Sequence, residues 1–471
     1  MGTSSPRSHP PQDAQPGASS EFTASQRADW LRRLTALFGL LLIGATWPLW
    51  MPQTQFPQAP LLSPFAAAPA WLQGGVAAGQ LLGLALALLA PAVNSVWRRG
   101  LLLFAGLTLL AVLFDQHRLQ PWTYQLAIVG VVLAGCSAPR AGLLLRILTV
   151  SLYAFSAISK LDYVFLHTVG QQLLAALLDL VGLNAQQISE PTRLMFAALF
   201  PLGELLVAAA LCFRPTRSIA LVGAIAMHLG LLIAVGPWGL QHKPAVLVWN
   251  LFFIAQDLLL FARLGNCDFF GSRIRQNLEA STKRPKFWRI RLQRKSQPER
   301  AAPRSLAARL AHLLVAAAVL LPLAEPWGWW DHWLAWGLYA PKASRALVYV
   351  HRSAAERFPP DLQLHLLEEH AASPWLRLRL DHWSLAALDA PLYPQARFQL
   401  AVAEAVGRRY GLNRLIRVAL LTRADRWTGA RQQRTLVGLQ AIIAAGRGYW
   451  FGAQPGALYL HRESFRRLNR S

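Results

Sequence analysis

Side chains that can hold or move a proton occur in segments of this chain that are otherwise apolar. Lys160 and Asp162 close the stretch YAFSAISKLDYVF, residues 153–165. Tyr153, Ser156 and Lys160 follow one another at spacings of three and four, which place them on one face of a helix. Two interpretations of the lysine stay open. Either it extends to a membrane surface as an anchor, or it is held in a desolvated pocket where it can act as a base.

Further polar side chains lie inside long apolar segments, where they are costly and are candidates for function. Glu204 lies in FPLGELLVAAALCF and His228 in SIALVGAIAMHLGLLIAVG, at comparable depths. They form either a mutually satisfied buried pair or part of a proton or ligand path. In VLVWNLFFIAQDLLLF, Asn250 is interpreted as an interhelical hydrogen-bonding residue. Asp257 in the same segment is interpreted as a solvated group or a partner of the basic flank.

A polar loop, DQHRLQPWTYQ at residues 115–125, stands between two apolar segments. His117 in this loop is expected at the mouth of the helices, close to Lys160. The candidate pocket or proton path around the candidate base Lys160 therefore comprises Tyr153, Ser156, Asp162, His117, Glu204, His228 and Asn250. No metal site is predicted, because the three cysteines lack the spacing of zinc ligands.

The composition indicates a membrane protein. Of 471 residues, 54% are hydrophobic and 15% are charged, whereas soluble domains carry about 25% charged residues. A helix needs about 20 apolar residues to cross a bilayer. Nine segments approach this length, at about 31–50, 71–93, 99–114, 122–138, 142–160, 192–212, 218–236, 244–262 and 306–324. The sequence therefore predicts a polytopic α-helical membrane protein with about nine spans and a C-terminal extracytoplasmic α+β domain.

Basic residues at the segment ends predict the orientation. Alternate flanks carry Arg27, Arg32, Arg33, Arg98, Arg99, Arg140, Arg146, Arg214 and Arg217, and the flanks between them carry few. Because positive flanks stay cytoplasmic, we expect the amino terminus inside a bacterial cell and the C-terminal region outside its inner membrane. The net charge of +24 is attributed to these flanks, so nucleic acid is not an expected partner.

Six regions are predicted along the chain. They are a disordered cytoplasmic tail (1–30), an eight-span bundle (31–262), a basic cytoplasmic linker (263–305), the ninth span (306–324), a Trp-rich interfacial segment (325–341) and the extracytoplasmic domain (342–471). The linker is expected to bind anionic membrane lipid. The Trp-rich segment is expected to form a helix lying on the membrane.

Within the C-terminal region, hydrophobic patterns predict both strands and helices. Strands are predicted from ALVYVH (346–351), WLRLRLDHW (375–383) and LIRVALLT (415–422). Helices are predicted at 393–411, ended by Gly411, and at about 432–446. No catalytic constellation is predicted in this region.

The motif Y-x-x-S-A-I-S-K-L-D, from Tyr153 to Asp162, resembles the aromatic–small–small–Lys–Leu–Asp signature of the horizontally transferred transmembrane (HTTM) domain family. That family contains the vitamin K-dependent gamma-carboxylases. The resemblance covers about residues 31–262. It implies a nine-span bundle under a β-rich outer domain, a vitamin K-like hydroquinone as cofactor, and Lys160 as the base that deprotonates it. Small-x-x-K-L is also similar to a motif of DoxX-like membrane proteins.

The chain departs from the carboxylase pattern at two places. YVFLHTVG follows the lysine where the family has an early Trp and Gly, and Ser159 stands where the carboxylases have a second lysine. Three hypotheses of function therefore stay open. The chain performs lysine-assisted chemistry with a quinone-like lipid, or it is a non-catalytic scaffold that presents its outer domain to an envelope protein. In the third, it carries a small lipid or solute, with Glu204 and His228 coupling transport to protons.

Overall fold

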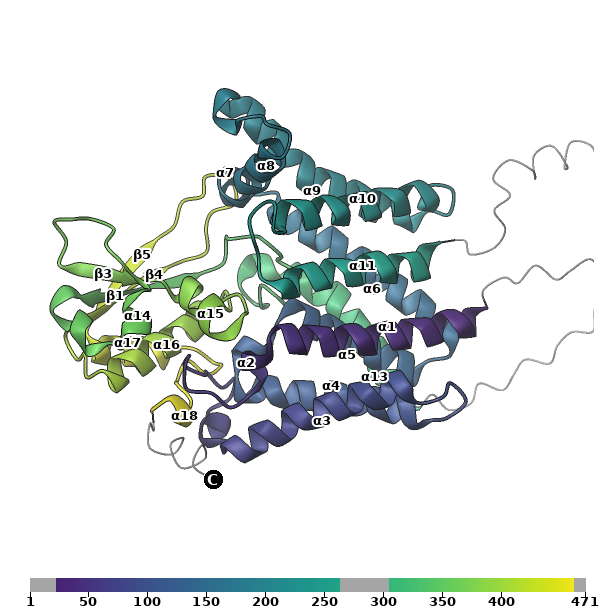
Figure 1. The fold of residues 1–471 in the computed structure, drawn as a ribbon, viewed down its shortest axis with the longest axis horizontal. Helices are drawn as coiled ribbons and strands as arrows, with labels where there is room; N and C mark the ends of the chain where they lie inside the picture. The colour runs from purple at the N-terminus through teal and green to yellow at the C-terminus, as the bar shows by residue number, and fades with distance from the viewer. Residues whose placement is uncertain (1–22, 263–304, 461–471) are drawn as a thin grey trace, which may run out of the picture.

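A computed structural model describes residues 23–262 and 305–460 of the chain. It consists of a long helical bundle with a smaller unit, containing a sheet, at one end (Figure 1). The predicted basic linker lies almost entirely outside the described residues, as do the first 22 residues of the predicted tail. Helix α1 (Ala24–Ala45) begins after Thr23, whose hydroxyl accepts from the Gln26 backbone N–H. The helix therefore covers the last seven residues of the predicted tail.

A helix lies at each of the nine predicted positions. The helices are α1, α3 (Ala70–Leu89), α4 (Val96–Phe114), α5 (Pro121–Gly135), α6 (Ala138–Lys160), α9 (Glu190–Cys212), α10 (Arg217–Val235), α11 (Pro244–Phe261) and α13 (Leu306–Leu320). Within the described residues, seven helices are long and apolar enough to cross a membrane, with α13 counted together with the 3-10 turn η4 (Leu321–Trp327). The chain is thus a multi-pass helical membrane protein, whereas the count of nine spans stays a prediction.

The two predicted spans that are not among these seven helices are α1 and α5. Helix α5 has only 15 residues, which span about 22 Å at 1.5 Å per residue. Helix α1 has 22 residues but carries Arg27, Asp29, Arg32 and Arg33 in its first three turns. Its Arg32 guanidinium donates to the carbonyls of Ala87 and Ala90 at the end of α3, at 2.5 and 2.9 Å. Cationic groups satisfy the free carbonyls of helix ends in this way.

Shorter elements connect the long helices. These are α2 (Trp47–Trp50), the 3-10 turns η1 (Ser63–Ala67), η2 (Gln116–Arg118) and η3 (Ala185–Gln187), and helices α7 (Tyr163–His167) and α8 (Val169–Asp179). Helices α3 and α4 approach closely through glycines, because a Cβ atom on Gly83 would lie 2.7 Å from the Gly100 carbonyl oxygen. Such close backbone contact is typical of packing in membranes.

The C-terminal unit, residues 342–460, contains an antiparallel sheet in the order β2-β3-β1-β4-β5. The strands are β1 (Arg345–His351), β2 (Leu366–Leu367), β3 (Trp375–Leu378), β4 (Ile416–Leu421) and β5 (Gln433–Val437). The helices are the 3-10 turn η5 (Arg352–Arg357), α14 (Pro360–Gln363), α15 (Leu380–Leu388), α16 (Ala396–Arg409), α17 (Leu439–Gly446) and α18 (Ala457–Leu460). The predicted strands at 346–351 and 415–422 are confirmed, as is the predicted helix at 393–411.

Two predicted elements of this unit are each divided in the structure. The strand predicted at 375–383 ends at Leu378, and helix α15 begins at Leu380 because Leu380, Trp383 and Leu388 share a buried face. The helix predicted at 432–446 is a strand followed by helix α17. The break is Gly438, whose φ of +83° is accessible to glycine and strained for other residues.

The Trp-rich segment forms no single interfacial helix, contrary to the prediction. After η4 it consists of turns. Trp327 and Trp329 are exposed, as a membrane-facing belt requires, but Trp333 and Trp336 are buried. The buried rings pack against aromatic rings of both units, Trp336 against Tyr124 of α5 and Trp333 against Tyr393 of the C-terminal unit.

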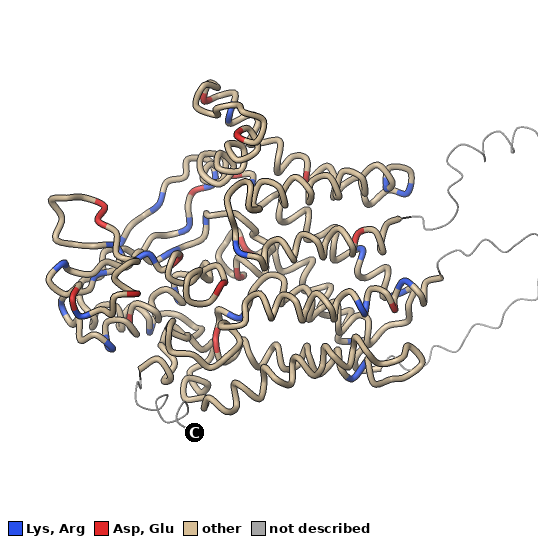
Figure 2. Tube along the Cα trace, viewed as in Figure 1, with Lys and Arg blue, Asp and Glu red and all other residues tan. Residues whose placement is uncertain are grey.

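The bundle has two distinct ends. Figure 1 shows the start of α1, the end of α11 and the start of α13 together at the end opposite the C-terminal unit. Figure 2 shows Lys and Arg at that end and in the C-terminal unit, with few charged residues along the middle of the helices. This arrangement agrees with the alternation of basic flanks, and which end faces the cytoplasm stays a prediction.

Candidate functional site

Lys160 is the last residue of α6, and its ammonium group is buried between helices. Lys160 Nζ lies 2.5 Å from Glu204 Oε2 on α9 and 2.8 Å from Ser156 Oγ one turn earlier on α6. The side chains of the lysine and the glutamate are only 11% and 8% exposed. The lysine therefore does not extend to the surface. The ammonium group and the carboxylate are shielded from water and pair with each other, and a buried charge is tolerated only when it is paired in this way.

A second cluster joins three helices about two turns before Lys160 on α6. The Tyr153 hydroxyl oxygen lies 2.5 Å from Asp257 Oδ2 of α11 and 2.8 Å from His228 Nε2 of α10. The other ring nitrogen, His228 Nδ1, lies 2.8 Å from Asn250 Oδ1. Asn250 is held in turn by its own amide, which donates to the Val246 carbonyl at 2.8 Å.

The hydrogen-bond inventory of this cluster allows two proton arrangements. Because Asn250 Oδ1 is an acceptor, His228 Nδ1 carries a hydrogen in both. In one, a protonated Asp257 donates to the Tyr153 oxygen and Tyr153 donates to His228 Nε2, so that all groups are neutral. In the other, a doubly protonated His228 donates to Tyr153, and Tyr153 donates to an ionised Asp257. Moving two hydrogens through the one hydroxyl interconverts them, which is the geometry that a proton relay requires.

The two clusters share helix α6 but are not in direct contact. Tyr153 and Lys160 are seven residues apart, about 10 Å along the axis, and Ser156 lies between them on the same face. Glu204 and His228 are therefore not paired with each other. Each is paired with a side chain of α6, so the hypothesis of a mutual Glu204–His228 pair is wrong.

Asp257 is a functional candidate that the sequence interpretation placed in the wrong environment. It was expected near the membrane surface or on a basic flank, but it is fully buried and bonded to Tyr153. Its Oδ1 has no hydrogen-bond partner among the described residues. Its spacing of seven from Asn250 was the available signal, because it puts both on one face of α11.

Asp162 and His117 lie apart from the lysine cluster. Asp162 caps the start of α7, because its Oδ1 accepts from the Phe165 backbone N–H at 2.8 Å. His117 was expected near Lys160 but faces the C-terminal unit. Its Nε2 lies 2.9 Å from the Pro391 carbonyl and 3.2 Å from Ser384 Oγ. These two residues stabilise local structure and the junction between bundle and C-terminal unit.

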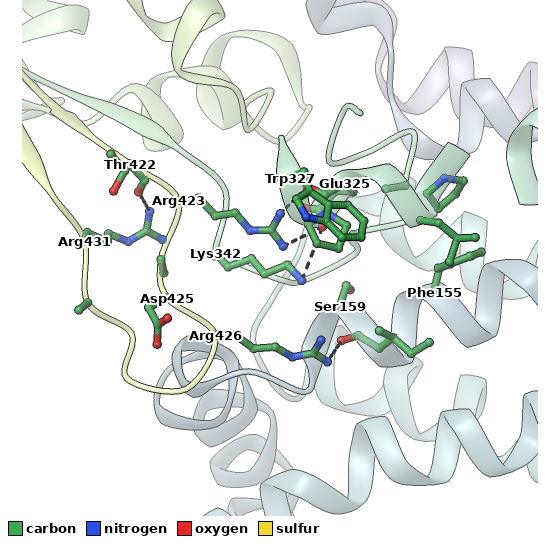
Figure 3. Close-up of a pocket in the computed structure, with 18 of the residues that line it drawn as sticks. Phe155, Ser159, Glu325, Trp327, Lys342, Thr422, Arg423, Asp425, Arg426 and Arg431 are labelled. Atoms are coloured by element: carbon green, nitrogen blue, oxygen red, sulfur yellow. Dashed lines mark hydrogen bonds and ion pairs between the residues drawn. The ribbon is translucent and has the colours of Figure 1, made fainter. Parts of the chain in front are cut away.

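A cleft of about 790 Å³ opens where the C-terminal unit meets the bundle (Figure 3). We call it the junction cleft. The bundle contributes Phe155, Ile158 and Ser159 of α6 together with residues of η4. The C-terminal unit contributes Lys342 and a loop at 422–432. Ser159 is the neighbour of Lys160 in the chain, so the cleft lies beside the turn of α6 that carries the lysine.

A second cavity of about 360 Å³ is more apolar, and we call it the aromatic cavity. Its wall includes Trp122, Trp249, Trp333 and Tyr339. Val246, whose carbonyl accepts from Asn250, also lines it. The volume lies within the range of small-molecule sites, and aromatic rings favour a planar, apolar ligand.

Among residues 23–262 and 305–460, no group of three or more His, Cys, Asp or Glu side chains is arranged to hold a metal ion. Comparisons with family models, with curated proteins and with solved structures found no match for this chain. The resemblance to the HTTM family therefore stays a prediction carried by the motif around Lys160.

Proposed function

We propose that this chain is a multi-pass protein of the HTTM kind in a bacterial inner membrane, and that it performs lysine-assisted proton transfer on a quinone-like lipid. The observation that carries the proposal is the pair between Lys160 Nζ and Glu204 Oε2, 2.5 Å apart inside the bundle. Ionisable residues that face the interior of a membrane bundle are expensive and mark functional sites.

The Lys160–Glu204 pair can supply a base without exposing a charge. Passage of one proton from Lys160 Nζ to Glu204 Oε2 leaves a neutral amine beside a neutral acid, which the bundle interior favours over separated charges. The amine can then accept a proton from an acidic hydroxyl of the substrate. The hydrogen bond to Ser156 Oγ at 2.8 Å holds Nζ in place during both steps.

The residues of the aromatic cavity, whose wall does not include Lys160 or Glu204, fit a quinone-like ring. Trp122, Trp249 and Tyr339 would hold it by ring contacts, and such a group would supply redox chemistry when bound. The relay of Asp257, Tyr153 and His228 ends at Asn250, which is held by a residue of this cavity wall. In the proposed function this relay stores or returns a proton at His228 while the Lys160 pair is reset.

A proton-coupled carrier is the second candidate. It is favoured by one observation, that α6 is tied by hydrogen bonds to α9, α10 and α11 at once. Reprotonation of any of these partners changes the contacts between helices, as alternating access requires. A scaffold without chemistry is the third, and it predicts that the clusters serve packing alone.

The test uses the full chain in lipid nanodiscs with vitamin K hydroquinone under air, and measures its conversion by chromatography. Lys160→Ala is expected to lower the rate by a factor of about 100 or more, the usual contribution of a positioned base. Lys243→Ala is the matched control, because that side chain is 39% exposed and pairs with Asp389.

Four outcomes separate the candidates. Loss of turnover in Lys160→Ala, with assembly intact by size-exclusion chromatography, supports the enzyme. Retained turnover in both Lys160→Ala and Lys160→Met refutes it. If Glu204→Gln abolishes proton-dependent uptake of a lipid or solute into vesicles while no variant affects hydroquinone conversion, the protein is a carrier. No effect in either assay favours the scaffold.

A further inference from the structure

The junction cleft combines two surfaces of opposite character. On the bundle side, Ile158, Leu323 and Trp327 line it and are 38, 58 and 69% exposed. They belong to the ends of α6 and of the α13–η4 span, so they lie where the hydrocarbon region of a bilayer would end. On the other side, the C-terminal unit contributes polar and cationic groups (Figure 3).

The charged groups of the cleft are unevenly balanced. Four cations line it, Lys342, Arg423, Arg426 and Arg431, against two carboxylates, Glu325 and Asp425. Arg423 uses the Glu325 carboxylate at 2.8 Å. Asp425 is exposed and accepts from the backbone and hydroxyl groups of Thr428 in its own loop, at 2.8 Å each. Among the described residues, no carboxylate lies within ion-pair distance of Arg426 or Arg431. Two charges outside the cleft wall also affect Arg431: Arg345 lowers its pKa and Asp162 raises it.

Among the described residues, Lys342 Nζ forms a long ion pair with Glu325 and donates no hydrogen bond. The residue is 4% exposed, and its nearest carboxylate oxygen within the described part of the chain is Glu325 Oε2 at 3.9 Å, too far for a hydrogen bond. Burial lowers the pKa of Lys342, Glu325 opposes this and Arg423 adds to it. Burial likewise lowers the pKa of Arg431 to about 10. Both shifts come chiefly from burial, and Lys342 shares its one close carboxylate, that of Glu325, with Arg423.

The two arginines nearest the bundle retain donors for an anion. Arg426 donates Nε to the Leu161 carbonyl at 2.9 Å and one terminal nitrogen to the Ile158 carbonyl at 3.0 Å. Its second terminal nitrogen has no partner within the described residues. Arg431 uses its two terminal nitrogens on the carbonyls of Pro341, Ala343 and Thr422, and its Nε is free in the same sense. Backbone contacts therefore orient both guanidinium groups without neutralising them.

From this arrangement we infer that the junction cleft binds an amphiphile with an anionic headgroup. The headgroup lies on Lys342, Arg426 and Arg431, and the apolar chain lies along Ile158, Leu323 and Trp327 toward the bilayer. A free anion would leave the apolar wall unused, and a zwitterionic lipid would place a cation among cations. This site goes beyond the proposed function and does not depend on chemistry at Lys160.

The experiment uses the full chain in detergent with a phosphatidic acid that carries a diazirine in its acyl chain. After irradiation, labelled peptides are mapped by mass spectrometry. Label is expected at residues 155–159 and 322–327. Lys342→Gln is expected to lower this label about tenfold, as the loss of one close charge contact in a partly desolvated site. Arg434→Gln, an exposed arginine of β5 outside the cleft lining, is the matched control.

Three comparisons decide the result. A phosphatidylcholine with the same diazirine should label these peptides weakly, and equal labelling would overturn the proposal in favour of a purely apolar site. Inorganic phosphate at millimolar concentration should not compete, and full competition would show a free-anion site instead. Lys160→Ala should leave the label unchanged, which separates this proposal from the proposed function.

A second variant tests the site in case Lys342→Gln does not fold. Leu323→Glu changes an exposed side chain and puts a carboxylate on the path of the acyl chain, so it should lower the label as strongly. If the label at both peptides is unchanged in a folded Lys342→Gln, or in Leu323→Glu, the headgroup site is refuted.

Discussion

Two buried groups at the junction of bundle and C-terminal unit are expected to cancel each other's pH dependence. Burial raises the pKa of Asp115 to about 6, although the Arg118 charge and the backbone N–H groups of His117 and Ala59 oppose the shift. Burial lowers the pKa of His117 to about 4, with the Arg118 charge adding to this and the Pro391 hydrogen bond opposing it. Both residues are almost completely buried, so both shifts disappear when the junction opens.

The two contributions have opposite signs. His117 is neutral in the folded protein, so its stabilisation is present above the unfolded pKa of 6.5 and is lost as the pH falls toward 4. Asp115 has a raised folded pKa, so its cost is present above pH 6 and is relieved as the pH falls toward 3.8. Between pH 7.5 and 5, linkage gives a loss of ~2 kcal/mol from His117 and a gain of ~1.4 kcal/mol from Asp115. Between these two pH values, the free energy of unfolding of the wild-type protein should therefore change by less than about 1 kcal/mol at this junction.

Single substitutions expose each contribution. Asp115→Asn leaves His117 alone and should become less stable by ~2 kcal/mol between pH 7.5 and 5, whereas His117→Gln should become more stable by ~1.4 kcal/mol. The assay is thermal unfolding in detergent at both pH values, followed by tryptophan fluorescence. Differences are taken relative to the wild type, and 1 kcal/mol corresponds to about 2–4 °C for a unit of 150–250 residues. Parallel pH profiles in wild type and both variants would refute the compensation.

Three further sets of substitutions test the contacts between helices of the bundle. Tyr153→Phe should destabilise by ~2–4 kcal/mol, because Asp257 and His228 each lose a buried partner, which chemical denaturation can measure. Lys160→Met and Glu204→Leu should each cost ~3–5 kcal/mol alone, since each strands a buried charge, and the double variant should recover most of it; additive losses would contradict the pairing. Gly83→Ala should cost ~1–3 kcal/mol by overpacking against α4. Gly74→Ala, whose added Cβ meets nothing within 4 Å, should be neutral.

Periodic apolar segments made the helices predictable, and polar residues inside them made most of the site predictable. Tyr153, Ser156 and Lys160 lie on one face of α6, as their spacing of three and four residues predicts. The pairing between helices could not be predicted, because it depends on helix rotation, which one segment does not specify. Glu204 and His228 were therefore matched by depth, although α6 lies between them in the hydrogen-bond network.

Elements at the junction were less predictable, since tertiary contacts outweigh local pattern there. The tryptophans of residues 325–341 have the composition of an interfacial belt, but Trp333 and Trp336 are buried at the junction of the bundle and the C-terminal unit. His117 is polar and follows an apolar segment, which suggested the mouth of the bundle. Its ring instead packs against the rings of Phe56 and Phe398, with distances of 5.5 and 5.0 Å between ring centroids. Such a site becomes apolar only when both units are present.

The end of α6 is where the C-terminal unit and the lysine cluster meet. A helix leaves its last carbonyls without intrahelical partners, and Arg426 donates to two of the carbonyls there, those of Ile158 and Leu161. The Tyr163 backbone N–H in turn donates to the Arg426 carbonyl at 2.8 Å. Lys160 lies between these contacts, so the position of its ammonium group depends on the loop that also lines the junction cleft. An anion bound at Arg426 would therefore lie beside the turn of helix that carries Lys160, while the Lys160 ammonium group itself stays on Ser156 and Glu204.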